Sequence, residues 1–407
     1  MRKANRSERK AKDMRSNTFF KKAALLCCGY GLMSDAVIVP LTTSILKDFP
    51  GTGEVLINFI IGGSFIFSLI SALVTGRVIH RFNKKNVLLF GTLVYSIASF
   101  ASAFAPNIAF LAVTRAIDGL TDGMVGVAVV LAISELFGDP LERNSMLGLH
   151  WTAVSAYGVA LSLLSGFLCV YSWRASLFSN ILSFITPLLI WIYVPSMPPR
   201  ETAVRPAAAN GSHDKAKEKL PWLWISFSLL AALVLNCLSN VFYFTADFYV
   251  AERALGSSAL TGAFTAMSTV GGAAGLVFGR LYGKLKNAFP VMMFAAAAAG
   301  TASLAFPIGA LWICFFHIII GATYTLGLSY YQASVVERIH SAKSGQILSF
   351  FDVTSYIGLS SSAYVPMVVA LFTGSESYVT CYIPISIVLL VFSGIYLLLL
   401  LHARKKD

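Results

Sequence analysis

The sequence predicts an all-α membrane protein with twelve transmembrane helices in two pseudosymmetric six-helix bundles. The chain of 407 residues is 57% hydrophobic and only 12% charged, which is about half the charge that a soluble domain uses to cover its surface. Its apolar residues lie in runs of roughly 20 or more, enough to cross ~30 Å of hydrocarbon. A short basic turn also recurs after half a chain length, which is typical of membrane proteins built from two similar halves.

Twelve apolar runs are expected to form the membrane-spanning helices, numbered helix 1 to helix 12 in chain order. They cover residues 23–46, 55–76, 87–106, 109–136, 147–170, 175–195, 222–250, 259–279, 288–306, 308–334, 346–371 and 378–401. The longest polar interruption, residues 196–221, divides them six and six. We therefore expect an N-terminal bundle (23–195), a cytoplasmic linker (196–221) and a C-terminal bundle (222–401), with tails at 1–22 and 402–407.

The net charge of +12 follows the predicted topology. If the N-terminus is cytoplasmic, 27 of the 31 Lys and Arg residues fall in cytoplasmic segments. Such a bias predicts that both termini are cytoplasmic, in the cell membrane and, for a bacterial protein, the inner membrane. Orientation thus accounts for the basic residues without a nucleic-acid partner, although the basic tail could also contact anionic lipid.

The cysteine pattern indicates no redox or metal chemistry. All six cysteines lie in apolar runs, and no Cys or His spacing typical of zinc sites or disulfide frameworks occurs. We expect no metal and no cofactor. The first 22 residues are too polar for a cleavable signal peptide, and the run after them is too long. That run is expected to remain as helix 1.

The recurring basic turn is the clearest sign of an internal repeat. Gly76-Arg77 opens the first basic turn (residues 77–86), and Gly279-Arg280 opens the second (residues 280–287), 203 residues later. In helices 4 and 10, Arg115-x3-Gly119 matches His317-x3-Gly321 at a similar offset. The two halves are therefore expected to face each other around a site near the middle of the membrane.

These patterns resemble the major facilitator superfamily over the full length of the chain. In that family the loop between helices 2 and 3 reads roughly G-x3-D-R-x-G-R-K. The matching residues here are Gly76, Arg81, Lys84 and Lys85. His80 stands for the Asp and Asn83 for the second Gly, which would make this turn a weaker or pH-sensitive latch. The resemblance implies that the turn latches the cytoplasmic side, and we expect Arg81 to pair with Glu135 at the inner end of helix 4.

Within the superfamily, the pattern is closest to proton-coupled drug exporters with twelve helices. Arg115 and Gly119 meet their helix 4 pattern R-x2-(Q)-G, with Asp118 where Gln is common. Trp173-Arg174 followed by Phe178 resembles the W-R-x3-F that opens their helix 6. The Gly-Pro motif of their helix 5 is replaced by Leu161-Ser162.

Helix 4 carries three charged residues on one face. Arg115, Asp118 and Asp122 stand at i, i+3 and i+7, so Arg115 and Asp122 point within about 20° of each other. Charges inside hydrocarbon usually line a cavity or a proton relay. The structural alternative is a buried Arg–Asp pair that holds helix 4 against helix 1 or 2. Because there are two acids for one base, we favour a role in proton coupling.

Asp35 in helix 1 is the strongest candidate for a proton carrier. It has no cation within a helical turn, and a carboxyl in a low-dielectric setting can exchange a proton near neutral pH. Two alternatives stay open, namely a salt bridge to Arg115 and recognition of a substrate cation.

Polar stripes on helices 7 and 10 are candidates for the wall of a substrate cavity. Asn236, Asn240, Tyr243 and Asp247 follow each other at helical spacing in helix 7; for Asp247, a gate and a plain interfacial role are equally compatible. In helix 10, His317 and Tyr324 share a face. A core position is the alternative for His317, which could otherwise titrate in the working pH range.

Asp352 lies about two turns from the inner end of helix 11. It is expected to belong to the cytoplasmic latch or a relay, or to pair with a loop cation such as Lys343 or Arg338.

Together these features predict a secondary active transporter, not an enzyme, that works by alternating access as a monomer in the lipid bilayer. Its expected partners are a small-molecule substrate and protons. We favour proton-coupled efflux of a small organic or drug-like solute over proton-coupled uptake of a small organic anion. Asp118-x3-Asp122 also resembles one motif of intramembrane prenyltransferases, but the second acidic cluster of those enzymes does not occur in the sequence.

Overall fold

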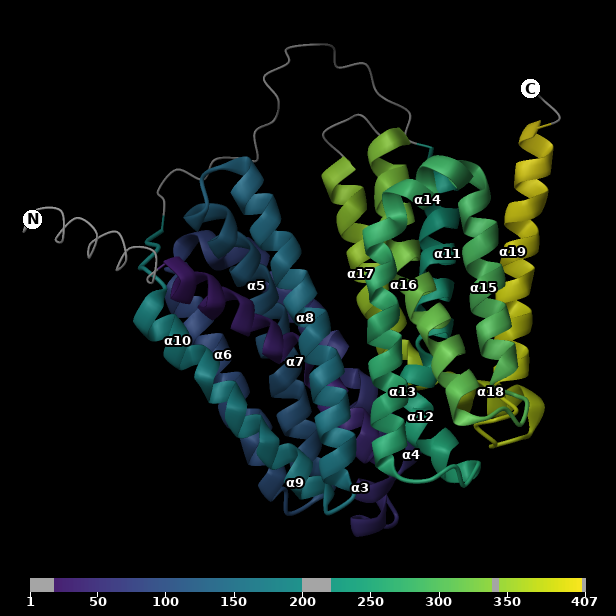
Figure 1. Cartoon of the computed structure of the whole chain (residues 1–407), viewed down its shortest axis with the longest axis horizontal. Coiled ribbons are helices and arrows are strands. Elements are labelled where there is room, and N and C mark those ends of the chain that lie inside the picture. The colour runs from purple at the N-terminus through teal and green to yellow at the C-terminus, as the bar shows by residue number, and fades with distance from the viewer. Residues whose placement is uncertain (1–17, 200–220, 339–343, 405–407) are drawn as a thin grey trace, which may run out of the picture. The chain divides into compact units, whose positions relative to one another are not determined.

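The computed structural model describes residues 18–199, 221–338 and 344–404, and within these ranges every regular element is a helix (Figure 1). Ten of the described helices are long and apolar enough to cross a membrane. The predicted all-α membrane class is therefore confirmed. Most of the predicted tails and linker, together with Lys343, lie outside the described residues.

The other two predicted spans are irregular. Helix 11 is a bent pair, in which Val353–Ser362 and Val365–Thr373 meet at 58°. Pro366 follows the bend and stands in the first turn of the second segment, where its missing N–H leaves no helical hydrogen bond unmade. Helix 9 is represented by a shorter apolar helix, Phe289–Ser303.

Several of the predicted spans consist of more than one helical element. Helix 1 (Thr18–Asp48) contains η1 (Cys28–Met33), α2 (Ser34–Ile38), η2 (Val39–Leu41) and α3 (Thr42–Asp48). Helix 2 contains α4 (Glu54–Asn58), η3 (Phe59–Gly63) and α5 (Ser64–Val78). Helices 3 to 6 contain α6 (Lys84–Ala101), α7 (Ile108–Leu136), α8 (Pro140–Cys169), α9 (Trp173–Phe178), η6 (Ser179–Phe184) and α10 (Ile185–Tyr193).

The second half follows the same order. Helices 7 and 8 contain α11 (Trp222–Ser239), α12 (Val241–Glu252), α13 (Ser258–Gly271) and η7 (Gly272–Val277), and α14 (Phe278–Leu285) carries the start of the second basic turn. Helices 9 to 12 contain α15 (Phe289–Ser303), α16 (Ala310–Arg338), α17 (Ser344–Ser362), α18 (Val365–Thr373) and α19 (Tyr382–Arg404).

The chain folds into two compact units that differ from the two sequence halves. Unit 1 comprises residues 1–34, 67–161 and 174–203, and unit 2 comprises residues 35–66, 162–173 and 204–407. We call the end of a helix near the turn at residues 49–53 its outer end, and the end near the basic turns its inner end. The outer segments of helices 1, 2 and 5 thus belong to unit 2.

Unit 1 is built around α6 and α7, which pack along each other. Its apolar core is closed at the inner end by Leu88, Ala128, Ile133 and Ile190, all without exposed surface. Unit 2 has its core among α11, α13, α15, α16 and α19, where α15 and α19 run side by side (Figure 1).

The outer segments in unit 2 pack closely on helices of the second half. A Cβ added at Gly166 of α8 would lie 2.6 Å from the carbonyl oxygen of Ser258, and one added at Gly62 of η3 would lie 3.2 Å from that of Ser360. Such distances leave no room for a side chain, so these glycines permit the backbones to approach.

One close helix crossing occurs in both halves. In unit 1, a Cβ added at Gly123 of α7 would lie 2.0 Å from the carbonyl oxygen of Ser68 in α5. In unit 2, a Cβ at Gly321 of α16 would lie 2.0 Å from the carbonyl oxygen of Ser268 in α13. Helices 2 and 4 therefore cross as helices 8 and 10 do, which is the kind of internal repeat expected from the sequence.

Candidate functional site

The centre of unit 1 holds a buried ion pair on α7. The Arg115 and Asp118 side chains are almost completely enclosed, and Arg115 Nη1 lies 3.2 Å from Asp118 Oδ2. The pair exists because a three-residue step on an α-helix places two side chains on one face. Two opposite charges in a low-dielectric interior offset part of each other's desolvation cost.

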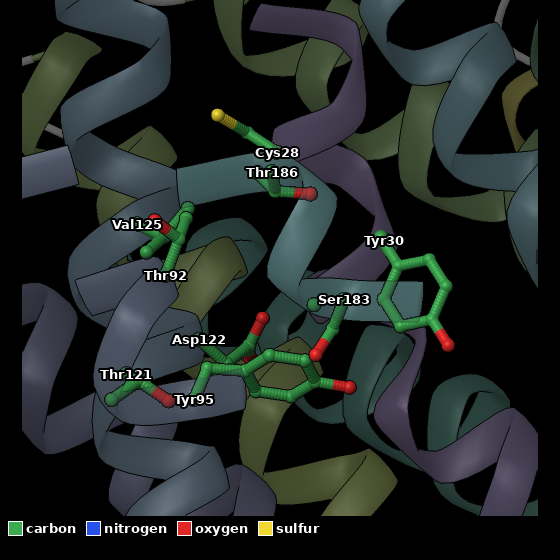
Figure 2. A pocket seen from close by; sticks show the side chains of 10 residues that line it. Cys28, Tyr30, Thr92, Tyr95, Thr121, Asp122, Val125, Ser183 and Thr186 are labelled. Atoms are coloured by element: carbon green, nitrogen blue, oxygen red, sulfur yellow. The ribbon is translucent and has the colours of Figure 1, made fainter. Parts of the chain in front are cut away.

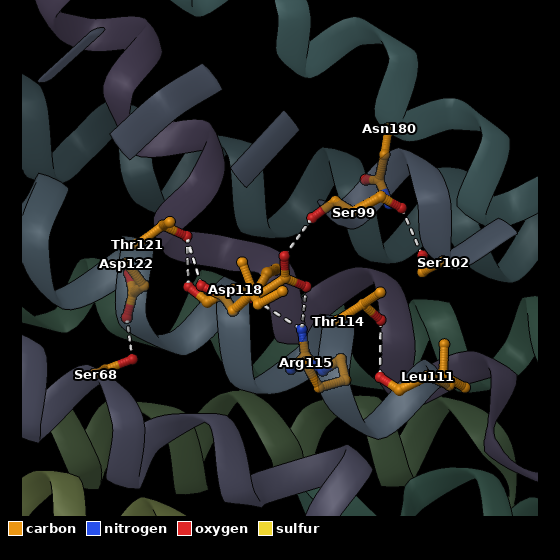
Figure 3. Close-up of polar contacts among 12 residues, drawn as sticks. Ser68, Ser99, Ser102, Leu111, Thr114, Arg115, Asp118, Thr121, Asp122 and Asn180 are labelled. Atoms are coloured by element: carbon orange, nitrogen blue, oxygen red, sulfur yellow. Dashed lines mark hydrogen bonds and ion pairs between the residues drawn. The ribbon is translucent and has the colours of Figure 1, made fainter. Parts of the chain in front are cut away.

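Hydroxyl groups on two other helices complete the hydrogen bonds of this pair (Figure 3). Arg115 Nη1 donates to Ser34 Oγ in helix 1 at 3.1 Å, and Ser99 Oγ in α6 donates to Asp118 Oδ1 at 2.8 Å. The pair therefore connects helices 1, 3 and 4. Ser34 directly precedes Asp35 in the chain, so the guanidinium contacts the residue next to the predicted proton carrier.

Asp122 points to a different neighbour from Asp118. Its Oδ2 accepts a hydrogen bond of 2.7 Å from Ser68 in α5, close to the Gly123 crossing (Figure 3). The sequence placed the three charges of α7 on one face, and the structure divides them between two interfaces of that helix. Asp35 itself is buried, with 8% of its surface exposed, and belongs to unit 2.

The predicted polar stripe of helix 7 is interrupted at Asn240, which separates α11 from α12. Asn236 donates to Ser355 Oγ in α17 at 3.1 Å, and the Asn240 amide donates to the Asn236 carbonyl at 2.7 Å. Tyr243 is buried and contacts the ring of Phe244. These groups thus form polar contacts inside unit 2.

The two candidates on α16 have different surroundings. The imidazole of His317 is fully buried, hydrogen-bonded through Nδ1 to the Phe264 carbonyl and packed edge-on against Phe242 at 4.6 Å between ring centroids. This environment favours the core role over contact with a substrate. The side chain of Tyr324 is half-buried.

Asp247 joins three helices at the outer end of unit 2. Its Oδ2 accepts hydrogen bonds from the Thr43 amide (2.7 Å) and hydroxyl (2.6 Å), and its Oδ1 accepts one from the Thr261 hydroxyl (2.9 Å). Thr43 lies in the first turn of α3, where backbone N–H groups lack helical partners and a negative charge is favourable. Asp247 therefore caps α3 from another helix and ties it to α12 and α13.

We expect Asp247→Ala to loosen this outer contact. Hydrogen bonds to a charged group contribute about 1.5–3 kcal/mol each, and a loss of only ~1.4 kcal/mol shifts an equilibrium tenfold. Cys169 is a native reporter, because it is buried and lies 3.4 Å from Ser44 in α3. Its labelling by a water-soluble maleimide, followed by mass spectrometry, should accelerate about tenfold or more.

The matched control is Asp247→Asn, which retains an oxygen for the two Thr43 hydrogen bonds and should give a smaller increase. If Cys169 reacts equally fast in the wild type and in Asp247→Ala, the carboxylate does not hold the outer segment of helix 1 in place.

The first basic turn is held by helices of its own unit. Lys84 Nζ forms an ion pair of 3.0 Å with Glu135, and Lys85 Nζ donates to the Trp191 carbonyl at 2.9 Å. The ion pair that the structure shows for Glu135 thus involves Lys84, three residues beyond the expected Arg81. Arg81 is exposed in the turn, and an added Cβ at Gly76 would meet no other atom.

The repeat has a counterpart of this contact. Glu337 stands at the inner end of α16, 202 residues after Glu135, and accepts a hydrogen bond of 2.6 Å from the Tyr282 hydroxyl in α14. Burial and this hydrogen bond raise the pKa of Tyr282 to about 12, so the phenol is a neutral donor at physiological pH. In both halves a glutamate at the end of helix 4 or 10 anchors the neighbouring turn. The side chain of Asp352 lies outside the described residues.

The structure adds partners that sequence reasoning did not identify. Ser34, Ser99 and Ser68 satisfy the charges of α7, and Thr43 and Thr261 satisfy Asp247. No spacing in the sequence could identify them, because the register between distant helices decides which hydroxyl meets which carboxylate. Within the described residues, no cluster of three or more His, Cys, Asp or Glu side chains is arranged to hold a metal ion.

Comparison with known proteins agrees with this architecture. The family model described as Major Facilitator Superfamily matches residues 24–363. The arabinose-proton symporter of Escherichia coli (strain K12) is 24% identical over 217 residues, which are 53% of this chain and 44% of that protein. The multidrug efflux pump SdrM of Staphylococcus aureus (strain N315) is 25% identical over 47% of this chain and 43% of its own. The chain thus spans less than half the length of these relatives.

Solved structures show the same fold at low sequence identity. A bacterial homologue of the human lysosomal transporter Spinster superposes with a TM-score of 0.70 and 12% identity, covering 93% of this chain and 96% of that one. A D-xylose-proton symporter superposes with a TM-score of 0.69 and 15% identity, covering 93% and 97%.

Proposed function

Because the chain belongs to the Major Facilitator Superfamily, we propose that it is a secondary active transporter that exports a small organic or drug-like solute in exchange for protons. It works by alternating access, as a monomer, in the cell membrane. Relatives named as efflux pumps and as proton symporters both support coupled transport.

The buried Arg115–Asp118 pair is the observation that carries this proposal. An ion pair enclosed in an apolar bundle is a poor source of stability, since two apolar side chains would often serve as well. Charges that remain inside a membrane protein are therefore functional candidates. We assign proton coupling to this pair together with Asp35 and Asp122, and the cavity wall to Asn236 and its neighbours on helix 7.

We favour export over uptake of an organic anion because of the two basic residues. The uptake hypothesis needs Arg115 and His317 to attract the anion. Arg115 is already neutralised by Asp118 at 3.2 Å, and the His317 imidazole is bonded to the Phe264 carbonyl. An anion would have to compete with both contacts, whereas a proton arriving at a carboxylate needs neither residue to be free.

The test is transport in proteoliposomes with an imposed pH gradient and a panel of candidate compounds. An inside-acidic gradient drives accumulation by a proton antiporter, and an outside-acidic gradient drives accumulation by a symporter. We expect accumulation with the inside-acidic gradient only. Accumulation only with the outside-acidic gradient would replace export by uptake.

Asp35→Asn should abolish gradient-driven accumulation while solute exchange without a gradient continues, because the amide cannot carry a proton. Asp48→Asn is the matched control: Asp48 also lies in helix 1, and an amide oxygen can still accept its 2.7 Å hydrogen bond from the Trp173 indole. This control should accumulate solute like the wild type. Undiminished accumulation by Asp35→Asn would rule out Asp35 as the proton carrier.

A further inference from the structure

Unit 1 contains a small polar chamber between helices 1, 3, 4 and 6 (Figure 2). Its walls combine hydroxyl groups, one carboxylate and few apolar groups. The lining residues that matter here are Tyr30, Gly31, Thr92, Tyr95, Asp122 and Ser183. The space is sufficient for about one water molecule, so an organic substrate does not fit.

Two tyrosine hydroxyls at this chamber lack hydrogen-bond partners. The side chains of Tyr30 and Tyr95 are 7% and 3% exposed, and neither hydroxyl forms a hydrogen bond with the described part of the chain. Ser99 lies near Tyr95, but its proton is donated to Asp118. A buried polar group without a partner costs about 1–3 kcal/mol, and such groups in folded proteins are usually satisfied by ordered water.

The other hydroxyls around the chamber leave acceptor positions available. Thr92 donates to the Leu88 carbonyl at 2.7 Å, and Ser183 donates to the Asn180 carbonyl at 2.6 Å. Their protons are therefore engaged, while their oxygens can still accept. Asp122 adds a carboxylate as a further acceptor. A molecule that both donates and accepts hydrogen bonds in this space would satisfy the tyrosines and meet these acceptors at once.

We propose that the chamber is a binding site for ordered water, held by the Tyr30 and Tyr95 hydroxyls and the Asp122 carboxylate. A buried water needs two to four polar partners and a polar surrounding, and the chamber provides both. The charged groups near it are Asp122 in its wall and the Asp118–Arg115 pair beside Tyr95. Water at this position connects Asp122 to Tyr95 through hydrogen bonds. The proposal does not depend on the direction or substrate of transport.

Radiolytic labelling of the purified full chain in water enriched in heavy oxygen tests this directly, because hydroxyl radicals formed from a bound water modify the side chains around it. We expect Tyr30 and Tyr95 to incorporate heavy oxygen several-fold faster than Tyr249. Tyr249 is the matched control, since it is equally buried (1% exposed) but donates to the Leu304 carbonyl at 2.9 Å. Equal, low incorporation at all three tyrosines would overturn the proposal.

A pair of glycine variants locates the water. A methyl group added at Gly31 enters the chamber and meets the Tyr95 ring at 3.5 Å, an ordinary contact. Gly126→Ala adds the same group at 3.6 Å from Leu32, away from the chamber lining. We expect Gly31→Ala to reduce labelling of Tyr30 and Tyr95 to the level of Tyr249, and Gly126→Ala to leave it unchanged. Undiminished labelling in a folded Gly31→Ala protein would also overturn the proposal; if that variant does not fold, the wild-type comparison decides.

Discussion

Arg115→Leu should destabilise unit 1 by about 3–5 kcal/mol, because it leaves the Asp118 carboxylate buried without its counter-charge. Ser99 would remain as a hydrogen-bond donor to Asp118 at 2.8 Å, but one neutral hydroxyl does not replace a cation. For a unit of this size the loss corresponds to a fall in melting temperature on the order of 10 °C. Thermal unfolding of the purified protein in detergent measures it.

A double variant separates stability from function. Arg115→Leu with Asp118→Leu removes both charges, and replacing a buried ion pair by apolar groups is often neutral or stabilising. We expect the double variant to regain most of the lost melting temperature while gradient-driven transport stays absent. Arg253→Leu is the control for loss of an arginine, since Arg253 donates to the Ala305 carbonyl at the outer end of unit 2. If the single variant melts like the wild type, the pair is not what keeps Asp118 buried.

Gly123→Ala should be nearly as damaging, although it adds a single methyl group. That group would lie 2.0 Å from the Ser68 carbonyl oxygen and 2.9 Å from the Ala72 amide nitrogen. Both atoms belong to a helix backbone and cannot turn aside as a side chain would. Overpacking costs about 1–3 kcal/mol, and we expect the upper part of this range. The 2.7 Å hydrogen bond from Ser68 to Asp122 should also be lost.

The same experiment in the second half tests the repeat. Gly321→Ala places a methyl group 2.0 Å from the Ser268 carbonyl oxygen and should lower the melting temperature by a similar amount. Gly148→Ala and Gly394→Ala are matched controls in the two units, because an added Cβ meets no other atom at either position. A melting temperature unchanged by both Gly123→Ala and Gly321→Ala would show that these crossings tolerate side chains.

Local geometry explains which parts of the site could be predicted from the sequence. A three-residue step on a helix fixes the direction of two side chains, so the proximity of Arg115 and Asp118 followed from their spacing. The seven-residue step to Asp122 gave a similar direction but not its partner, Ser68. That partner depends on the helix crossing at Gly123, which is a tertiary property.

Helix 1 shows where sequence reasoning ends. Its apolar run predicted one continuous span, whereas the structure divides it around Pro40 and starts a new helical segment at Thr42. The first-turn amide of Thr43 then lacks a helical partner and receives Asp247 from helix 7. Neither the break nor the partner 204 residues away leaves a periodic signal in the sequence, because apolar content alone sets the hydropathy of the run.

The glycine crossings also have a mechanical consequence. Where side chains separate two helices, rotamer changes can absorb part of a displacement. At Gly123 the two backbones are in direct contact, so this crossing has little compliance, and a force on helix 4 reaches helix 2 almost undiminished. Helices 8 and 10 have the same stiffness at Gly321. Each pair can therefore act as one lever arm, and elastic deformation within a half must be taken up by its other, looser contacts.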